Sequence, residues 1–292
     1  MSVAACKMSP RTGIRQVHMS HCIARFIAAL FAVVFVSVAT DVSAQTPQVF
    51  SGTGVDGVTA AIASFKAAIG GADNGAVTGS QPAGFRQVTW DDVPDSLATP
   101  RPFVDGFDFY NTASPRGLLL RATPVLEGQE PNALEVSANA ANPGSTPVLF
   151  GNINPALPSY LAAFSPQRIF GVFPLYRDPV VFVTFKVPGT STSATVSGFG
   201  AVFTDVNLTG STQLSFYDLN NGSLGTFTVP AASGHQTVSF YGVVFPGAQI
   251  SSIRIKAGTA AVSTSVLEDA THDIVALDDF VYAEPQPSRR RR

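Results

Sequence analysis

The fold class is decided by the stretch TQLSFYDLNNGSLGTFTV, residues Thr212–Val229. It contains two short segments rich in aromatic, aliphatic and threonine residues, Thr212–Tyr217 and Leu224–Val229, which are typical of β-strands. Between them, Asn221-Gly222 supplies the positive backbone φ angles of a tight hairpin turn. The stretch therefore predicts two antiparallel strands.

Similar segments recur on both sides of this hairpin. In Ser252–Ala257, apolar and polar residues alternate with the period of two expected of a strand that is buried on one face. The other candidate strands are Phe85–Trp90, Gly117–Thr123, Leu134–Ser137, Val180–Val187, Ala194–Thr204, Thr237–Phe245, Ile250–Lys256 and Ile274–Tyr282. Many short strands without intervening helices predict a mainly β fold, an antiparallel β-sandwich of jelly-roll-like form, over residues 85–283.

One short helix is expected before the sandwich, in residues 45–84. In Val58–Ile69 the apolar residues Ile62, Phe65 and Ile69 recur at intervals of three and four, and Gly70-Gly71 follows as a C-terminal cap. Gly70–Gly84 is rich in Gly, Asn, Asp, Ser and Pro and is expected to be a loop.

The first 44 residues have the pattern of a secretory signal. Phe26–Val38 is an uncharged apolar run, shorter than the roughly 20 residues that span a bilayer. Basic residues precede it, and the small residues Val42-Ser43-Ala44 follow, as signal peptidase requires. Cleavage is expected after Ala44, and translation from Met19 would give a signal of more ordinary length.

Removal of that signal changes the composition of the chain. Both cysteines, Cys6 and Cys22, would be lost, so no disulfide or cysteine metal site is expected in the mature protein. Four cations but only one acid would go with them, which makes the mature chain more acidic than the net −2 of the whole sequence. An acidic body argues against nucleic acid as a partner, and it is compatible with divalent cations.

Two segments have unusual composition. Ala138–Arg177 carries many prolines together with aromatic residues, which either seal one end of the sandwich or line a groove; we favour sealing. Residues 284–292, the Pro-rich Glu284–Ser288 and Arg289–Arg292, are expected to be disordered and solvated. Once the signal is removed, no stable membrane anchor is expected.

The order of several motifs matches a known group of proteins. The motifs are Thr89–Asp95, Ser114–Gly117, Phe150–Pro155, Phe164–Arg168, Ser197–Val206 and Leu277–Tyr282. In these motifs the chain resembles a family of exported bacterial proteins, similar to the β-sandwich domains of PEP-CTERM exosortase substrates. The resemblance implies a secreted sandwich with no established activity. At Glu284–Pro287 the apolar segment of a PEP-CTERM sorting tail is missing, so anchoring by that route is not expected.

No catalytic motif stands out in the mature sequence. Its two histidines are His235, in a Ser-Gly-His-Gln turn, and His272, beside Asp273. There is no nucleophile elbow, zinc-protease motif or phosphate-binding glycine loop. The five mature glutamates cannot be paired by spacing, although a secreted hydrolase of glycosidase type remains the alternative function.

Aspartates at strand positions are more informative. On the last predicted strand, alternation places Asp278 on one face with Phe280 and Tyr282, and Asp279 on the other with Val281. Asp205 ends another strand. A carboxylate that faces a core must be hydrogen-bonded, paired or bound to a metal. Two interpretations stay open: hydrogen bonds to backbone amides at strand ends or bulges, or a Ca²⁺ site at Asp278, Asp279 and Asp205.

Oxygen-rich pairs in two loops, Asp73-Asn74 and Asp91-Asp92, are weaker candidates for the same ion. Taken together, the sequence predicts a secreted, non-catalytic binding or surface-structural module. Its expected location is extracellular, on the cell surface or in the periplasm, and its expected partner is a glycan or cell-surface matrix.

Overall fold

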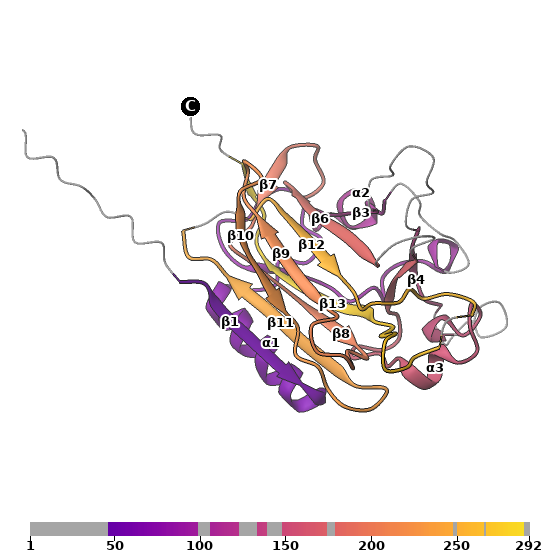
Figure 1. The fold of residues 1–292 in the computed structure, drawn as a ribbon. Coiled ribbons are helices and arrows are strands. Elements are labelled where there is room, and N and C mark those ends of the chain that lie inside the picture. The colour runs from indigo at the N-terminus through magenta and orange to yellow at the C-terminus, as the bar shows by residue number, and fades with distance from the viewer. Residues whose placement is uncertain are drawn as a thin grey trace, which may run out of the picture. The chain divides into compact units, whose positions relative to one another are not determined.

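The computed structural model describes residues 46–98, 106–122, 133–138, 148–173, 179–247, 250–265 and 267–288. They form a mainly β structure of two antiparallel sheets that pack face to face, which confirms the predicted sandwich (Figure 1). The predicted signal, residues 1–44, lies outside the described residues and stays a prediction. Among the described residues, no helix has the length and apolar character of a membrane span.

Each sheet has seven strands among the described residues. The first sheet runs β1 (Gln48–Thr53), β11 (Val238–Val244), β8 (Gly198–Thr204), β13 (Ala276–Ala283), β5 (Phe170–Phe173) and β4 (Ala133–Val136), and β2 (Phe85–Val88) also pairs with β13. The second runs β10 (Ser223–Thr228), β9 (Gln213–Tyr217), β12 (Ser252–Lys256), β6 (Val180–Lys186), β7 (Ser193–Thr195) and β14 (Gln286–Pro287), and β3 (Leu118–Ala122) also pairs with β6.

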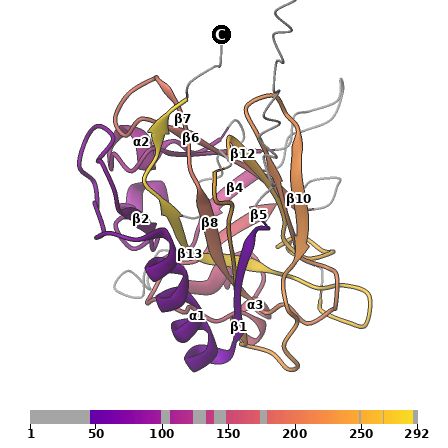
Figure 2. The ribbon, with the colours of Figure 1, turned by 90° about the vertical axis from the view of Figure 1, so that its left-hand side faces the viewer.

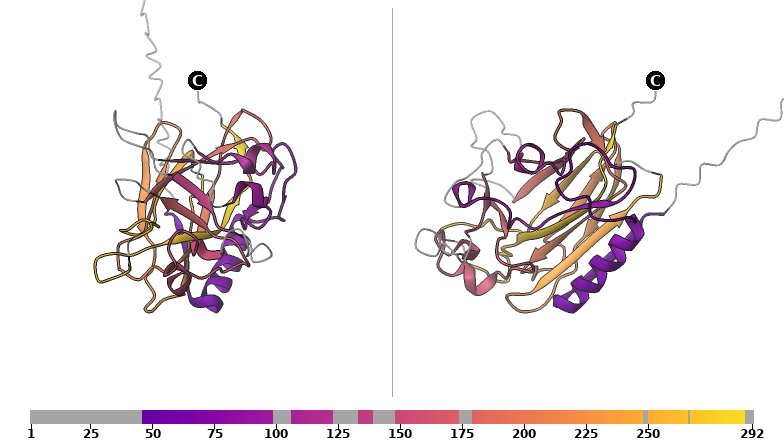
Figure 3. Two further views of the ribbon diagram at one scale, coloured as in Figure 1. Left: turned by 90° about the vertical axis from the view of Figure 1, so that its right-hand side faces the viewer. Right: turned by 180° about the vertical axis from the view of Figure 1, so that it is seen from behind.

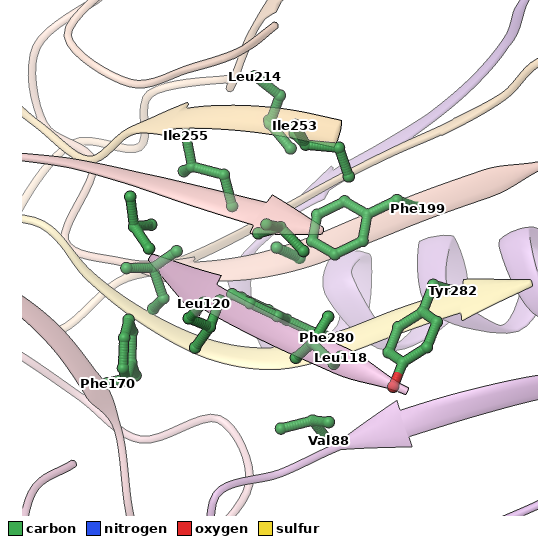
Figure 4. Packing of buried hydrophobic residues seen from close by; sticks show 14 of the residues in the cluster. Val88, Leu118, Leu120, Phe170, Phe199, Leu214, Ile253, Ile255, Phe280 and Tyr282 are labelled. Atoms are coloured by element: carbon green, nitrogen blue, oxygen red, sulfur yellow. The ribbon is translucent and has the colours of Figure 1, made fainter. Parts of the chain in front are cut away.

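The main core fills the space between the two sheets. Ile253 and Ile255 of β12 point from the second sheet toward Phe199 of the first (Figure 4). Their polar neighbours on β12, such as Arg254, are only partly buried. The alternation read from the sequence therefore sets which face of this strand is inside.

The outer face of the first sheet is covered by the helix α1 (Gly54–Ile69), which lies along β1 and β11 (Figures 2 and 3). Phe65 of α1 is fully buried and packs edge-on against Phe240 of β11, with 5.8 Å between ring centroids. The helix begins four residues before the predicted start. Strand β1, which precedes it, was not predicted.

Two further short helices, α2 (Phe109–Thr112) and α3 (Leu157–Tyr160), lie in connections, as do the 3₁₀ turns Asp95–Leu97 and Val148–Phe150. Phe150 and Leu157 are fully buried in a satellite core with Ile169 and Ile274. Of the described aromatic residues in the segment 138–177, Phe150 is in this satellite core, and Tyr160 and Phe173 pack against it while partly buried.

The hairpin between β9 and β10 is confirmed, but its turn differs from the expected one. The turn spans Asp218–Gly222, and within it only Asn221 adopts a positive φ, of 59°. The carboxylate of Asp218 accepts hydrogen bonds from the amides of Asn220 and Gly222. The Asp218 side chain therefore stabilises this turn, which has one residue with positive φ where two were expected.

The prediction of disorder from Glu284 onward is wrong for the described residues Glu284–Ser288. Glu284 is buried and forms an ion pair with Arg86, and Gln286–Pro287 pairs with β7 as β14. The pairing partner of a carboxylate is set by distant parts of the chain, so the composition of the tail could not reveal it.

Candidate functional site

Three side chains from separate loops meet at one point near α3. The Nδ1 atom of His235 lies 3.3 Å from Asp205 Oδ2 and 3.1 Å from Glu268 Oε2. Possible ligand atoms of all three lie within 4.8 Å of one another. We call these residues, together with Asn207, the loop site. Of the Ca²⁺ candidates chosen from the sequence, Asp205 is part of it and Asp278 and Asp279 are not.

Each member is positioned by local backbone structure. Asp205 directly follows β8, with a φ of 65° that is uncommon for a residue other than glycine, and its amide donates to Thr237 O at 2.8 Å. His235 lies in the turn between β10 and β11. Glu268 lies in the loop before β13 and accepts a 2.7 Å hydrogen bond from the amide of Ile274.

A fourth carboxylate, Asp273, organises the loop that carries Asn207. It is fully buried and accepts hydrogen bonds from the amides of Asn207 and Leu208, at 2.9 and 3.3 Å, and from the Ser211 hydroxyl. Asn207 Nδ2 in turn donates to Glu268 Oε2 at 2.7 Å. Asp273 therefore acts as a positioning residue for the loop site.

Burial dominates the electrostatics of the loop site. The side chains of Asp205 and Glu268 are 0% and 4% exposed, whereas that of His235 is 48% exposed. Burial, with the neighbouring Glu268 carboxylate as the next cause, raises the pKa of Asp205 to about 9. Burial also raises the pKa of Glu268. A positive charge placed at this point would favour the ionised forms of both carboxyl groups.

Two oxygen atoms at the loop site have no hydrogen-bond partner. They are Asp205 Oδ1 and Asn207 Oδ1, and both are inaccessible to solvent. Buried acceptors without a donor are costly and require an explanation. The donor set here, one imidazole nitrogen and several oxygens, is one that can hold a metal ion.

The paired carboxyl groups do not suit glycoside hydrolysis. Possible ligand oxygens of Asp205 and Glu268 lie within 4.8 Å of one another. Glycosidases need their two carboxyl groups about 5–9.5 Å apart, with the sugar between them. This pair therefore does not provide the geometry that the alternative function requires.

Asp278 and Asp279 lie next to each other in a β-bulge. The register of β13 against β8 shifts between Leu277 and Phe280, so that Leu277, Phe280 and Tyr282 all face the main core. The strict alternation assumed for this strand is therefore wrong, because the bulge inserts one extra residue. The Ser165 hydroxyl contacts both carboxylates, so Asp278 and Asp279 lie on the same side of the strand and not on opposite faces as alternation predicted.

Protein donors occupy both carboxylates of the bulge. Asp278 Oδ2 accepts a 2.5 Å hydrogen bond from the amide of Phe164, and Asp279 accepts from the Ser165 hydroxyl at 2.7 Å and from Gln87 Nε2 at 2.9 Å. These contacts are those of the hydrogen-bonding interpretation that the sequence left open. Calcium at this pair stays a prediction that chelation can test.

This carboxyl pair predicts a pH dependence of stability. Burial raises the pKa of Asp278 well above its usual value, with the neighbouring Asp279 as the next cause. The folded chain thus keeps a proton that the unfolded chain releases above about pH 4. The contribution of Asp278 is fully present below that pH and is lost as the pH rises.

We expect Asp278→Asn, which mimics the protonated acid, to flatten the decline of the unfolding free energy between about pH 5 and pH 8. Asp278→Ala, which leaves the Phe164 amide without an acceptor, should instead cost about 1–3 kcal/mol. Urea unfolding of both variants at the two pH values checks this. An Asn variant that loses stability as steeply as the natural chain would contradict it.

Residue spacing reveals little of the loop site. Glu268, His235, Asn207 and Asp273 lie in segments whose sequence gives no sign of a shared site. In the two oxygen-rich loops, Asp73 accepts a hydrogen bond from the amide of Gly75, and Asp91 accepts one from the amide of Gln167. A local signal existed only for Asp205, which ends a strand.

Comparisons with known proteins find no family for the chain and two distant structural similarities. No protein-family model matches the chain, and no curated protein matches it. The structure is similar to the enzymatically active domain of bacteriophage CBA120 tailspike protein 4, with 12% identity and a TM-score of 0.28, over 66% of this chain and 22% of that one. It is also similar to the K2 cleaved adhesin domain of Lys-gingipain, with 10% identity and a TM-score of 0.26, over 68% of this chain and 97% of that one. The chain thus aligns with only about a fifth of the tailspike domain, and at these TM-scores neither likeness bears on function.

Proposed function

We propose that the protein is an exported, non-catalytic module that binds a glycan of the cell surface or surrounding matrix at the loop site. The observation that carries this proposal is the tilted contact of the His235 and Tyr160 rings beside two buried carboxylates. The two rings lie 4.8 Å apart between centroids, at an interplanar angle of 48°.

An aromatic pair beside polar groups suits a sugar. The ring faces offer apolar surface to the C–H face of a pyranose, while oxygen and amide groups fix its hydroxyls. Tyr160 and His235 are both partly exposed, so they are accessible. Hydrogen bonds from Gln236 to Tyr160 O and Pro158 O hold α3 against the turn that carries His235.

Binding without turnover is favoured by the carboxyl geometry, since Asp205 and Glu268 are too close to flank a glycosidic bond. Export is supported by the sequence of residues 1–44. A sandwich with a filled core can present loops at its end as a binding surface.

A glycan array probed with the chain from Gln45 tests the proposal. We expect binding that Tyr160→Ala weakens about tenfold or more, equivalent to about 1.4 kcal/mol. The matched control is Tyr217→Ala, a partly exposed tyrosine at the end of β9 remote from the loop site. Hydrolysis of a bound glycan, or binding that depends on Tyr217 and not on Tyr160, would contradict the proposal.

A further inference from the structure

The donor set of the loop site combines nitrogen and oxygen at a single point. His235 Nδ1 lies close to both carboxylates, at 3.3 Å from Asp205 Oδ2 and 3.1 Å from Glu268 Oε2. We propose that these three atoms bind one transition-metal cation of the Zn²⁺ class. This inference deepens the proposed function and rests on it only for the role of the open coordination position.

The distances suit a small ion. Tetrahedral Zn²⁺, with ligands at about 2.0–2.2 Å, separates neighbouring ligand atoms by about 3.3 Å. The separations of His235 Nδ1 from the two carboxylate oxygens are 3.1 and 3.3 Å. No large movement of the three side chains is needed to admit the ion.

A second observation points to a cation independently of these distances. Asp205 is fully buried, and its Oδ1 atom has no hydrogen-bond partner. In the part of the chain that the structure describes, His235 is the one basic side chain that pairs with Asp205 or Glu268. Two buried carboxylates therefore share a single half-exposed imidazole, and a divalent ion would supply the missing positive charge.

Asn207 offers a further oxygen. Its Nδ2 atom lies 2.7 Å from Glu268 Oε2 and 3.4 Å from His235 Nδ1, while its Oδ1 atom is buried without a partner. A half-turn of the amide, which exchanges the two atoms, would direct Oδ1 toward the other ligands. Asp273 fixes the backbone of this loop and so positions Asn207.

The imidazole distinguishes this site from the Ca²⁺ site considered for Asp205 from the sequence. Calcium takes oxygen ligands, usually six to eight of them, whereas imidazole nitrogen suits zinc and its neighbours. The exposed side of His235 leaves a coordination position that water, or a hydroxyl of the proposed glycan, can fill. A metal site with an open position of this kind can take part in ligand binding.

The test uses the chelator-treated chain from Gln45 and Zn²⁺, Co²⁺ or Ca²⁺ alone, without glycan. By calorimetry we expect one Zn²⁺ per chain, bound at least about 100-fold more tightly than Ca²⁺. Bound Co²⁺ should show the visible absorption of a tetrahedral nitrogen- and oxygen-ligated ion. His235→Ala and the isosteric Glu268→Gln should each weaken Zn²⁺ binding about 100-fold or more.

The matched control is His272→Ala. His272 is 50% exposed and lies 2.8 Å from Asp269 Oδ2, but it belongs to no three-residue cluster among the described residues. Zn²⁺ affinity that is unchanged in the control and lost in both loop-site variants, with their far-UV circular dichroism unaltered, supports the inference. Absence of Zn²⁺ binding, equal affinity for Ca²⁺, or affinity that survives His235→Ala overturns it. Zn²⁺ binding by a chain that binds no glycan would reject the proposed function alone, and glycan binding without Zn²⁺ affinity would reject the metal site alone.

Discussion

Replacing Glu284 by alanine is expected to lower the free energy of unfolding by about 3–5 kcal/mol, because it leaves a buried arginine without its counter-charge. Arg86 is fully buried, and its Nε and Nη2 atoms donate to the two carboxylate oxygens of Glu284 at 2.8 and 2.7 Å. Its remaining donors reach four backbone carbonyls, those of Gly75, Val77, Gly79 and Pro115. Those carbonyls cannot replace a full negative charge.

Glu284 also has hydrogen-bond partners other than Arg86. Its carboxylate also accepts hydrogen bonds from the Gln81 amide and from Asn74 Nδ2. Glu284→Gln keeps the shape and part of this network, so it should destabilise less than Glu284→Ala. The comparison is made by urea unfolding followed by circular dichroism.

Asp269→Ala serves as the comparison, since its exposed carboxylate also accepts hydrogen bonds, from the amides of Thr271 and His272, and its loss should destabilise the chain less than loss of the buried Glu284. If Glu284→Ala were as stable as the natural chain, the segment Glu284–Ser288 would not be part of the folded domain. The outcome therefore also tests whether Glu284–Ser288 is ordered as part of the folded domain.

Replacing Trp90 by alanine is expected to cost about 3–5 kcal/mol, as for other large aromatic residues deleted from a core. Trp90 is fully buried and stacks on Phe170, with 4.5 Å between ring centroids, and it meets Phe280 edge-on at 5.2 Å. Its Nε1 atom donates to the carbonyl of Asp278 at 2.8 Å. This hydrogen bond satisfies a carbonyl that lies in the β13 bulge.

Trp90→Phe separates the two contributions, because it keeps an aromatic ring and removes the donor. It should cost less than the alanine variant because it keeps ring packing, and its own cost should include about 1–3 kcal/mol for the Asp278 carbonyl that both variants leave unpaired. Trp90 is the single tryptophan of the sequence, so unfolding must be followed by circular dichroism. Equal stability of the Phe and Ala variants would show that ring packing contributes little here.

The sequence was sufficient wherever a strand alternates regularly. Ile253 and Ile255 point into the core as their spacing predicts. The helix α1 packs through Ile62 and Phe65, which belong to the apolar pattern that predicts the helix. Strand β1 was missed because Gln48–Thr53 has little apolar periodicity, and it forms only by pairing with β11. The bulge at Asp278-Asp279 was missed because alternation assumes an uninterrupted ladder.

The loop site could be predicted only in part. Asp205 was found because a carboxylate at the end of an apolar strand is unusual. Glu268 and His235 have no local pattern, and they meet Asp205 only through the paths of two loops that the hydrogen bonds of Asp273 and Gln236 fix. Long-range contacts of this kind follow from the completed fold and not from residue spacing.

The place of β13 in the first sheet has a consequence for how the molecule assembles. This strand comes late in the sequence, yet it lies inside the sheet, paired with β8 on one side and with β2 and β5 on the other. During synthesis, β8 and β5 keep open edges until residues Ala276–Ala283 leave the ribosome, so the two halves of the sheet cannot join earlier. Pairings between such distant segments form slowly, because the chain entropy of closing the loops must first be overcome. The first sheet can therefore be completed only after nearly all of the chain has been made.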